Sequence, residues 1–251
     1  MHPMHPMQTR VPFSSLLPLL ALVLALPTTH ASPSAPADRV DLGSFQIDRT
    51  EVTIAQFQRY AEATGVRTQA EREGGGFEYV GGWQRRPGWT WRTPDGVAPS
   101  SLQLPAAHLT YAEAAAYCQW AGGRLPTAAE WISAAYTEQR AQPPAPFVRG
   151  QTYPYPTGAS PDGANTSGTD PWPRAAPAGA TAPGVNGLYD MGANVWEWVS
   201  DQRGTGSGEE RRTMGGSWWY GVSQMRASVD AWKSASFYAV YIGMRCAYDK
   251  R

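Results

Sequence analysis

Histidine is almost absent from this 251-residue chain once its first thirty residues are set aside. Three of the four histidines, His2, His5 and His30, lie in that N-terminal stretch, so that only His108 remains. A single histidine excludes, within one chain, a three-histidine zinc site, a two-histidine iron triad and bis-histidine haem ligation. Any metal must therefore bind mainly to oxygen ligands. His108 precedes a predicted helix, where we expect a structural hydrogen bond rather than catalysis.

Cysteine and an excess of charge are lacking as well. Cys118 and Cys246 are the only two cysteines, and their distant positions do not form a Cys-x-x-Cys redox pair. The chain has 21 Lys and Arg residues against 21 Asp and Glu residues, which gives a formal net charge of zero. Near-neutrality provides no electrostatic basis for binding nucleic acid or an anionic membrane. We therefore expect no nucleic-acid partner.

The first 31 residues have the pattern of a secretory signal peptide. Arg10 is their only charged side chain, residues 16–26 are an apolar run, and small residues flank His30 at the expected cleavage site. The apolar run is too short to cross a bilayer. We expect cleavage, no membrane insertion afterwards, and a periplasmic or secreted mature chain, although a retained N-terminal anchor is an alternative. Residues 32–41, rich in Ser, Ala and Pro, are expected to be a flexible leader.

Periodicity and capping signals predict a few short elements within one domain, residues 42–251. Thr53 caps a helix predicted to reach about residue 63, with Gly65 as its end. Capping boxes at Thr110 and Thr127 open two more helices, over residues 111–121 and up to about residue 136. Strands are predicted over residues 45–48, 212–218 and 238–248. Residues 138–185 show little periodicity, so we expect a long loop pinned by function or by an ion.

Residues 184–201 combine aromatic rings with carboxylates more closely than any other segment. Asp190, Asn194 and Glu197 stand among the rings of Tyr189, Trp196 and Trp198. Rings favour burial, whereas carboxylates resist it unless they are paired or bound to a cation. This mixture favours a core loop folded around a hard ion such as calcium, which binds carboxylate and carbonyl oxygens. A metal-free, hydrogen-bonded aromatic turn is equally consistent with the residues alone.

The same segment resembles the signature of the formylglycine-generating enzyme (sulfatase-modifying factor) family. Four further stretches agree in the family's order: residues 45–53, 109–131, 215–217 and 243–246. The resemblance extends from about Leu42 to Ala247. It implies an α+β, C-type-lectin-like formylglycine-generating-enzyme fold with little regular secondary structure. It also implies a disulfide between Cys118 and Cys246.

The resemblance further implies two structural calcium sites. The first maps onto the side chains of Asp190 and Glu197 and the backbone carbonyls of Ala193 and Val195. The second maps onto the side chains of Asn165 and Asp170 and the carbonyls of Thr166 and Trp172. Calcium is therefore the one cofactor that the sequence predicts.

The catalytic positions of the family are not matched. After Gly215-Gly216-Ser217, oxygen-activating members carry two cysteines that bind copper(I), whereas this chain has Tyr220 and Met225. Neither residue can form a thiolate, so we predict no catalytic residue. The remaining polar and aromatic residues of this region favour a ligand- or partner-binding surface, with core packing of the rings as the alternative. They are Ser217, Trp218, Trp219, Tyr220, Arg226 and Asp230.

Three functions are consistent with this pattern. The first is an exported, calcium-stabilised, non-catalytic binding or regulatory protein of the periplasm, with a protein or small-molecule partner that the sequence does not identify. The second is an oxidoreductase resembling the siderophore-maturing branch of the family. A formylglycine-generating oxidase acting on sulfatases ranks last, because its copper ligands are missing.

Overall fold

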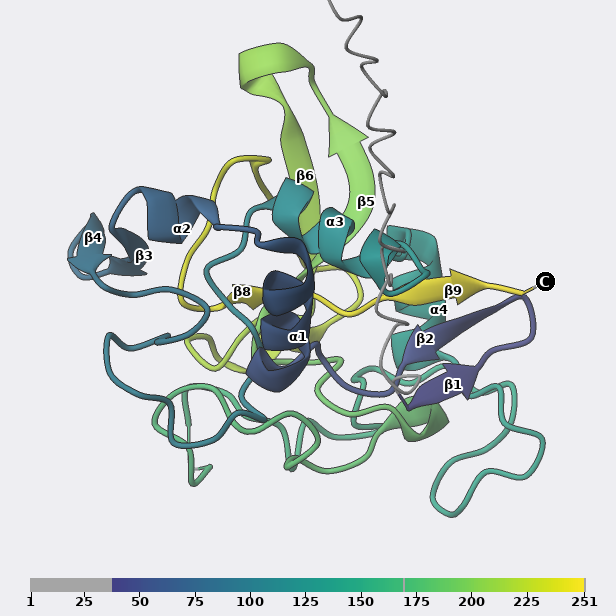
Figure 1. The fold of residues 1–251 in the computed structure, drawn as a ribbon. Helices are drawn as coiled ribbons and strands as arrows, with labels where there is room; N and C mark the ends of the chain where they lie inside the picture. Colours follow the sequence, from purple (N-terminus) through teal and green to yellow (C-terminus); the bar gives the residue numbers. More distant parts are fainter. Residues whose placement is uncertain (1–37, 169, 251) are drawn as a thin grey trace, which may run out of the picture. The chain divides into compact units, whose positions relative to one another are not determined.

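The computed structural model describes residues 38–168 and 170–250 (Figure 1). The expected signal peptide and residues 32–37 of the expected leader lie outside these ranges. Within them, the chain is an α+β domain with short helices and small sheets, which confirms the predicted fold class. No helix in the described ranges is long and apolar enough to span a bilayer.

Each helix begins at a threonine whose side chain accepts a hydrogen bond from the third residue of the helix. The caps are Thr53 for α1 (Ile54–Thr64), Thr68 for α2 (Gln69–Arg72), Thr110 for α3 (Tyr111–Trp120) and Thr127 for α4 (Ala128–Tyr136). In all four, a Gln or Glu at that third position bonds back to the threonine N–H, completing a capping box. The sequence predicted three of these helices. It missed α2, although Thr68 and Glu71 carry the same signal.

The first sheet joins the beginning of the domain to its end. Its order is β1 (Arg39–Asp41), β2 (Phe45–Asp48) and β9 (Ala247–Asp249), all antiparallel. Figure 1 shows the N-terminal strands beside the C-terminal one. The expectation of a flexible leader up to residue 41 was wrong at its end, because Arg39–Asp41 pair with Gln46–Asp48. Val40 is buried there and draws the segment into the core.

The largest sheet has the order β7-β6-β5-β8 and carries the motif that stood out in the sequence. Its strands are β5 (Trp196–Arg203), β6 (Glu210–Met214), β7 (Asp230–Ser234) and β8 (Ile242–Gly243), with β8 parallel to β5. The second half of the motif is therefore a strand rather than a loop. The strands expected over residues 212–218 and 238–248 are shorter and displaced, because irregular backbone at residues 215–217 and 244–246 interrupts them.

The remaining elements are short. Strands β3 (Gly75–Tyr79) and β4 (Trp83–Pro87) form a hairpin. Three 3₁₀ turns, η1 (Val185–Gly187), η2 (Gly206–Gly208) and η3 (Val222–Met225), lie in the C-terminal half. No helix or strand occurs in the described part of residues 138–184, as predicted.

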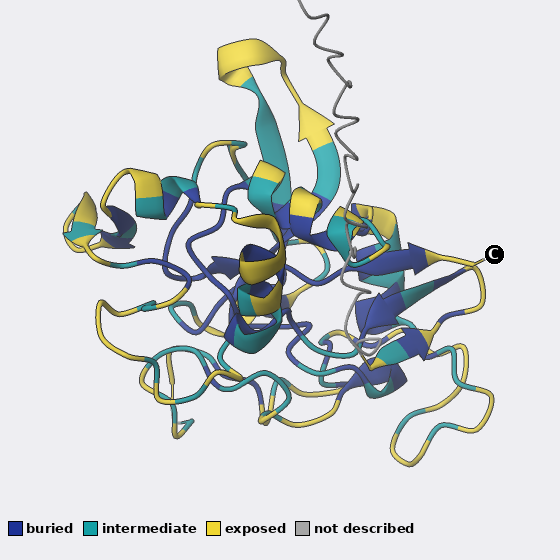
Figure 2. Ribbon diagram, viewed as in Figure 1, coloured by how far each residue is buried: buried dark blue, intermediate teal, exposed yellow. Residues whose placement is uncertain are grey.

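Rings and one disulfide hold the core. Phe57 and Tyr60 of α1 pack against Tyr117 of α3, with ring centroids 5.7 and 5.6 Å from that of Tyr117. Cys118 of the same helix is bonded to Cys246, which confirms the predicted pairing. Burial is concentrated under α1 and along β2 and β9, whereas the far end of the β5–β6 hairpin is exposed (Figure 2). The disulfide thus fixes α3 to the segment that leads into β9.

Candidate functional site

Three residues just before β5 adopt a left-handed backbone conformation that L-amino acids rarely take. The φ angle is 58° at Asp190, 68° at Ala193 and 50° at Asn194. Such conformations persist only where the surrounding contacts hold them, and they concentrate at functional sites. Gly192 has no room for a side chain, because a Cβ there would lie 2.9 Å from atoms of Met225 and Pro156. Packing therefore fixes the direction of each side chain in this turn.

Glu197, an expected calcium ligand, forms a buried ion pair with Arg245. Nε and Nη2 of Arg245 donate to its two carboxylate oxygens at 2.8 and 2.7 Å, and the indole N–H of Trp131 donates at 2.7 Å. The side chains of Arg245 and Glu197 are 0% and 1% exposed. Arg245 therefore supplies a counter-charge for this carboxylate, and the role of Glu197 as a calcium ligand stays a prediction.

Asp190, the other expected carboxylate ligand, is held by uncharged donors. One oxygen accepts the N–H of Gly179 at 2.7 Å, and the other accepts the hydroxyl of Thr181 at 2.5 Å. Burial raises the pKa of Asp190 above its ordinary value, although these two hydrogen bonds act in the opposite direction. This carboxylate has no hydrogen-bonded cation among the described residues.

Glu51 is the residue of this site that the sequence reasoning missed. It lies directly before α1, is 1% exposed, and accepts hydrogen bonds from Asn194 Nδ2 at 2.7 Å and Val195 N–H at 3.2 Å. Burial raises its pKa well above the ordinary value, and the negative charges of Asp190 and Glu197 raise it further. The position of Glu51 inside residues 45–53, a stretch that carries the family resemblance, was a signal that could have identified it.

These groups give the interior an excess of negative charge. Three buried carboxylates, those of Glu51, Asp190 and Glu197, share one buried guanidinium, that of Arg245. Calcium would fit this charge and this oxygen-rich surrounding. Within the described ranges, no three Asp, Glu, His or Cys side chains gather closely enough to bind one ion. A calcium ion here would therefore rely partly on carbonyls, as the expected set of Ala193 and Val195 requires. A proton on Glu51 would relieve the same imbalance.

The second expected calcium loop is linked to the first by a hydrogen bond between two amides. Asn165 Nδ2 donates to Asn194 Oδ1 at 2.9 Å, while Asn165 Oδ1 is buried without a partner among residues 38–168 and 170–250. Asp170 accepts the N–H groups of Thr166 and Trp172 at 3.0 and 2.9 Å, which brings these expected ligands into one turn. The orphaned Asn165 oxygen and the nearby Asp170 fit a calcium ion.

The expected binding surface is divided by the structure. Ser217 and Trp218 are buried, whereas Trp219 and Tyr220 are half-buried. Trp218 packs edge-on against Trp219 at 5.1 Å, and Tyr220 packs against Tyr241 at 5.9 Å. Core packing therefore describes Trp218, whereas Trp219 and Tyr220 reach the surface, where a ligand or partner could bind.

Arg226 and Asp230 each have a polar partner outside these rings. Arg226 is exposed and donates to the hydroxyl of Tyr155 at 2.8 Å. Asp230 begins β7 and pairs with Arg212 of β6. Their part in a binding surface with Trp218 and Trp219 stays a prediction.

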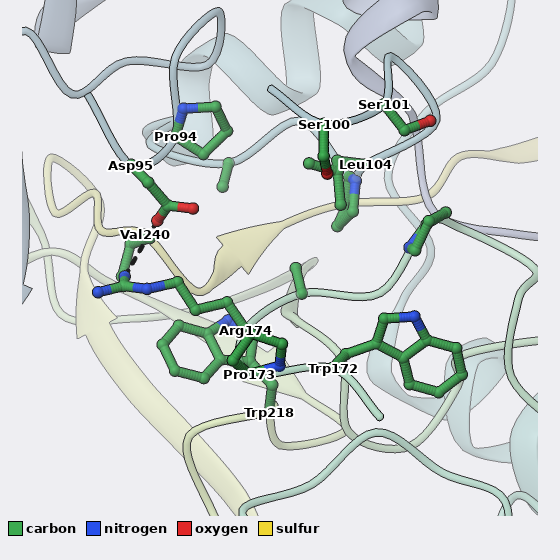
Figure 3. A pocket seen from close by; sticks show the side chains of 14 residues that line it. Pro94, Asp95, Ser100, Ser101, Leu104, Trp172, Pro173, Arg174, Trp218 and Val240 are labelled. Carbon is green, nitrogen blue, oxygen red and sulfur yellow. Dashed lines mark ion pairs between the residues drawn. The ribbon is translucent and has the colours of Figure 1, made fainter. Parts of the chain in front are cut away.

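A cavity of about 400 Å³ lies beside Trp218. Its walls are mostly apolar and combine prolines with Leu104, Val240, Trp172 and Trp218. Figure 3 shows the two indoles and Arg174 on one side and Ser100 and Ser101 on the other. An apolar pocket with a few polar groups is the usual form of a small-molecule site.

Two polar features mark the wall of this cavity. Arg174 forms an ion pair with Asp95 at 3.0 Å, and its guanidinium lies 5.4 Å from the centre of the Trp218 ring. The indole nitrogen of Trp218 is buried and has no hydrogen-bond partner in the described structure. A buried donor without a partner is costly.

Comparisons with known proteins agree with the sequence resemblance. A family model described as "Sulfatase-modifying factor enzyme 1-like domain" matches residues 22–250. The formylglycine-generating enzyme of Mus musculus is 29% identical, over 89% of this chain and 71% of its own length. The inactive C-alpha-formylglycine-generating enzyme 2 of Mus musculus is 30% identical, over 73% and 66%. The hercynine oxygenase of Mycolicibacterium thermoresistibile is 32% identical, over 85% of this chain and 53% of its own.

Among solved structures, the fold is similar to that of PvdO from Pseudomonas aeruginosa. The TM-score is 0.59 with 22% sequence identity, and the match covers 82% of this chain and 80% of the other. At this identity the likeness supports the fold alone. The relatives include both active and inactive proteins, so the function depends on the residues of this chain.

Proposed function

The chain belongs to the sulfatase-modifying factor family, and on that premise we propose that it is a non-catalytic binding or regulatory protein. The observation that carries the proposal is the state of its cysteines. Both are joined in one disulfide, and the positions expected to bind copper hold Tyr220 and Met225. Copper(I) prefers soft thiolate ligands, and this chain has none to offer. The mouse relative named inactive gives a precedent for a family member without the activity.

The ligand of this protein would bind in the cavity beside Trp218. An apolar wall favours a ring or a proline, and the indole N–H of Trp218 requires an acceptor such as a carbonyl oxygen. A small neutral molecule or peptide segment with these two features therefore fits the cavity best. Calcium at the two loops would stabilise the walls, because Trp172 belongs both to the second loop and to the cavity. The apolar N-terminal segment supports a periplasmic or secreted location.

A test of the binding site uses acetylated dipeptide amides that contain proline or an aromatic residue. Ligand-observed NMR would identify those that bind the purified protein. Trp218→Phe removes the indole donor but retains a ring, and we expect affinity to fall about three- to tenfold, as for the loss of one hydrogen bond. Arg226→Gln is the matched control, because Arg226 lies against Tyr155. Equal binding by wild type and Trp218→Phe would remove the cavity from the proposal.

An oxidoreductase is the second candidate, and the match to a hercynine oxygenase favours it. Oxygen consumption would be measured with the protein loaded separately with copper and iron, using a cysteine-containing sulfatase-type peptide. We expect no turnover above the metal alone. Turnover that survives Tyr220→Phe would show that another centre performs the chemistry and would overturn the non-catalytic proposal.

A further inference from the structure

Lys233 is an amine without an acidic partner in the middle of an aromatic cluster. The chain has only two lysines, and the other, Lys250, pairs with Asp41 at 2.6 Å. Within residues 38–168 and 170–250, no carboxylate lies within ion-pair distance of Lys233, and its amine makes no hydrogen bond. A half-buried cation without a partner is costly, because it loses water without gaining a counter-charge.

An indole ring lies directly under this amine. The nitrogen Nζ is 5.1 Å from the centre of the Trp196 ring. Trp196 is 2% exposed, and its own indole N–H is buried without a partner in the part of the chain that the structure describes. The ring of Tyr220 lies edge-on to Trp196 at 6.0 Å and extends the cluster to Tyr241. The amine therefore borders a set of aromatic rings that includes Tyr220, one of the two residues at the expected copper positions.

The charged groups around Lys233 do not make an anion site. Arg211 stands directly opposite on β6, but its guanidinium is held by Glu209 at 2.7 Å and donates to the Tyr111 hydroxyl at 3.1 Å. On β5, the neighbouring group is the uncharged Trp196. A single cation against apolar rings provides too few donors to hold a carboxylate or phosphate, which usually takes several. Covalent capture of a carbonyl group needs only the one amine.

We propose that Lys233 is a reactive amine that forms a Schiff base with a small aromatic aldehyde, whose ring packs against the half-buried ring of Tyr220. The nitrogen lone pair attacks the carbonyl carbon and forms a C–N bond. The carbinolamine then loses the former carbonyl oxygen as water, which takes both amine protons, and a C=N bond remains. No electrons are transferred, so no oxidant or reductant is required. This site depends neither on the cavity beside Trp218 nor on the absence of catalysis by copper.

The protonation of the amine supports this chemistry, because only a neutral amine attacks a carbonyl. Burial lowers the pKa of Lys233 to about 8. About a tenth of the molecules would then carry a neutral amine at pH 7, whereas an unperturbed lysine, with a pKa near 10.4, would be neutral in fewer than about one in a thousand.

The test is reductive alkylation with benzaldehyde and cyanoborohydride, which traps the imine, followed by peptide mass spectrometry. At pH 7 we expect Lys233 to be alkylated at least tenfold faster than Lys250, and we expect this preference to disappear in urea-unfolded protein. The rate at Lys233 should reach half its maximum near pH 8. Lys250→Arg should leave the labelling of Lys233 unchanged, whereas Lys233→Arg should abolish it without changing the circular dichroism spectrum.

Several outcomes would overturn the proposal. Labelling of Lys233 at or below the rate of Lys250 would show that its amine is either protonated or inaccessible. An equal preference in the unfolded chain would show that the local sequence, rather than the aromatic cluster, causes it. A rate that still rises above pH 10 would show that the amine titrates as an ordinary lysine does.

Discussion

Arg245 and Glu197 are joined at 2.7 Å in an ion pair that solvent does not reach. Glu197 lies on β5, and Arg245 follows β8, the parallel neighbour of β5. The ion pair therefore joins these two segments. The guanidinium also donates to the backbone carbonyls of Tyr189, Asp48 and Arg49 at 2.8–3.2 Å. One side chain thus connects the turn before β5, the end of β2 and the segment before β9.

Breaking this pair should be far more damaging than breaking a surface pair. Glu197→Gln leaves the Arg245 guanidinium buried without its counter-charge, and we expect a loss of about 3–5 kcal/mol in the free energy of unfolding. Urea unfolding measures this loss. Arg203→Gln is the control, since it breaks the exposed pair with Glu210 and should cost at most about 1 kcal/mol. Similar losses in the two variants would contradict the special role of the buried pair.

Removal of calcium should lower the melting temperature. If calcium is present at 100 times its dissociation constant, it contributes about 2.7 kcal/mol, and chelation removes this contribution. Asp190→Asn and Asp170→Asn weaken one loop each, so each should reduce the response to chelator, and the double variant should abolish it. If chelator leaves the melting temperature of the wild type unchanged, protons and protein donors balance these carboxylates without a metal ion.

Acid should destabilise the fold through His108. Burial lowers the pKa of His108 to about 4, below the ordinary value of 6.5, while Nε2 lies 2.9 Å from the carbonyl oxygen of Pro94. The unfolded chain binds the proton first, so stability falls as the pH drops from about 6.5 to about 4. The loss should be about 3 kcal/mol.

The measurement for His108 is a difference between two proteins. His108→Asn removes the titrating group, and asparagine tolerates the φ of 58° found there. Asp48 changes the stability in the opposite direction, because burial raises its pKa to about 6. Its contribution to the free energy of unfolding is lost as the pH rises from about 4 to about 6. The total stability can therefore be flat over this range. The difference between wild type and His108→Asn should still show the slope, and a constant difference would contradict the assignment.

The disulfide should contribute a large part of the stability. Cys118 and Cys246 are 128 positions apart, and closing a loop of this length is worth about 4–5 kcal/mol in the chain-entropy model. The Cys118→Ala, Cys246→Ala double variant should lose that amount in urea unfolding. Thiol counting on the unreduced, denatured wild type should find no free thiol, and two free thiols would disprove the bond.

Local signals predicted the helices well because they act over four residues. Thr53, Thr110 and Thr127 each fixed the start of a helix within one residue. Strand boundaries were harder, since pairing depends on distant partners. The β5 strand was hidden because Trp196, Glu197 and Trp198 are all buried and show no alternation.

The burial of the expected calcium ligands was predicted from the sequence, but their hydrogen-bond and ion-pair partners were not. Asp190 and Glu197 are buried, as inferred from their aromatic neighbours. The sequence could not show that Arg245 would reach Glu197 or that Asn194 would connect Glu51 to Asn165, because these contacts join segments far apart in the chain. The sequence likewise could not show that Arg226 would contact Tyr155 or that Asp230 would pair with Arg212.

The pairing of β2 with β9 has a consequence for biosynthesis. Phe45 takes its strand partner from Asp249, at the opposite end of the domain. A nascent chain cannot complete this sheet until β9 has emerged from the ribosome, since contacts of such long range form only when both segments are available. Until then the edge of β2 and the thiol of Cys118 are without their native partners. The chain therefore gains its native structure late and as a whole, and a premature stop before β9 would leave even the N-terminal strands incomplete.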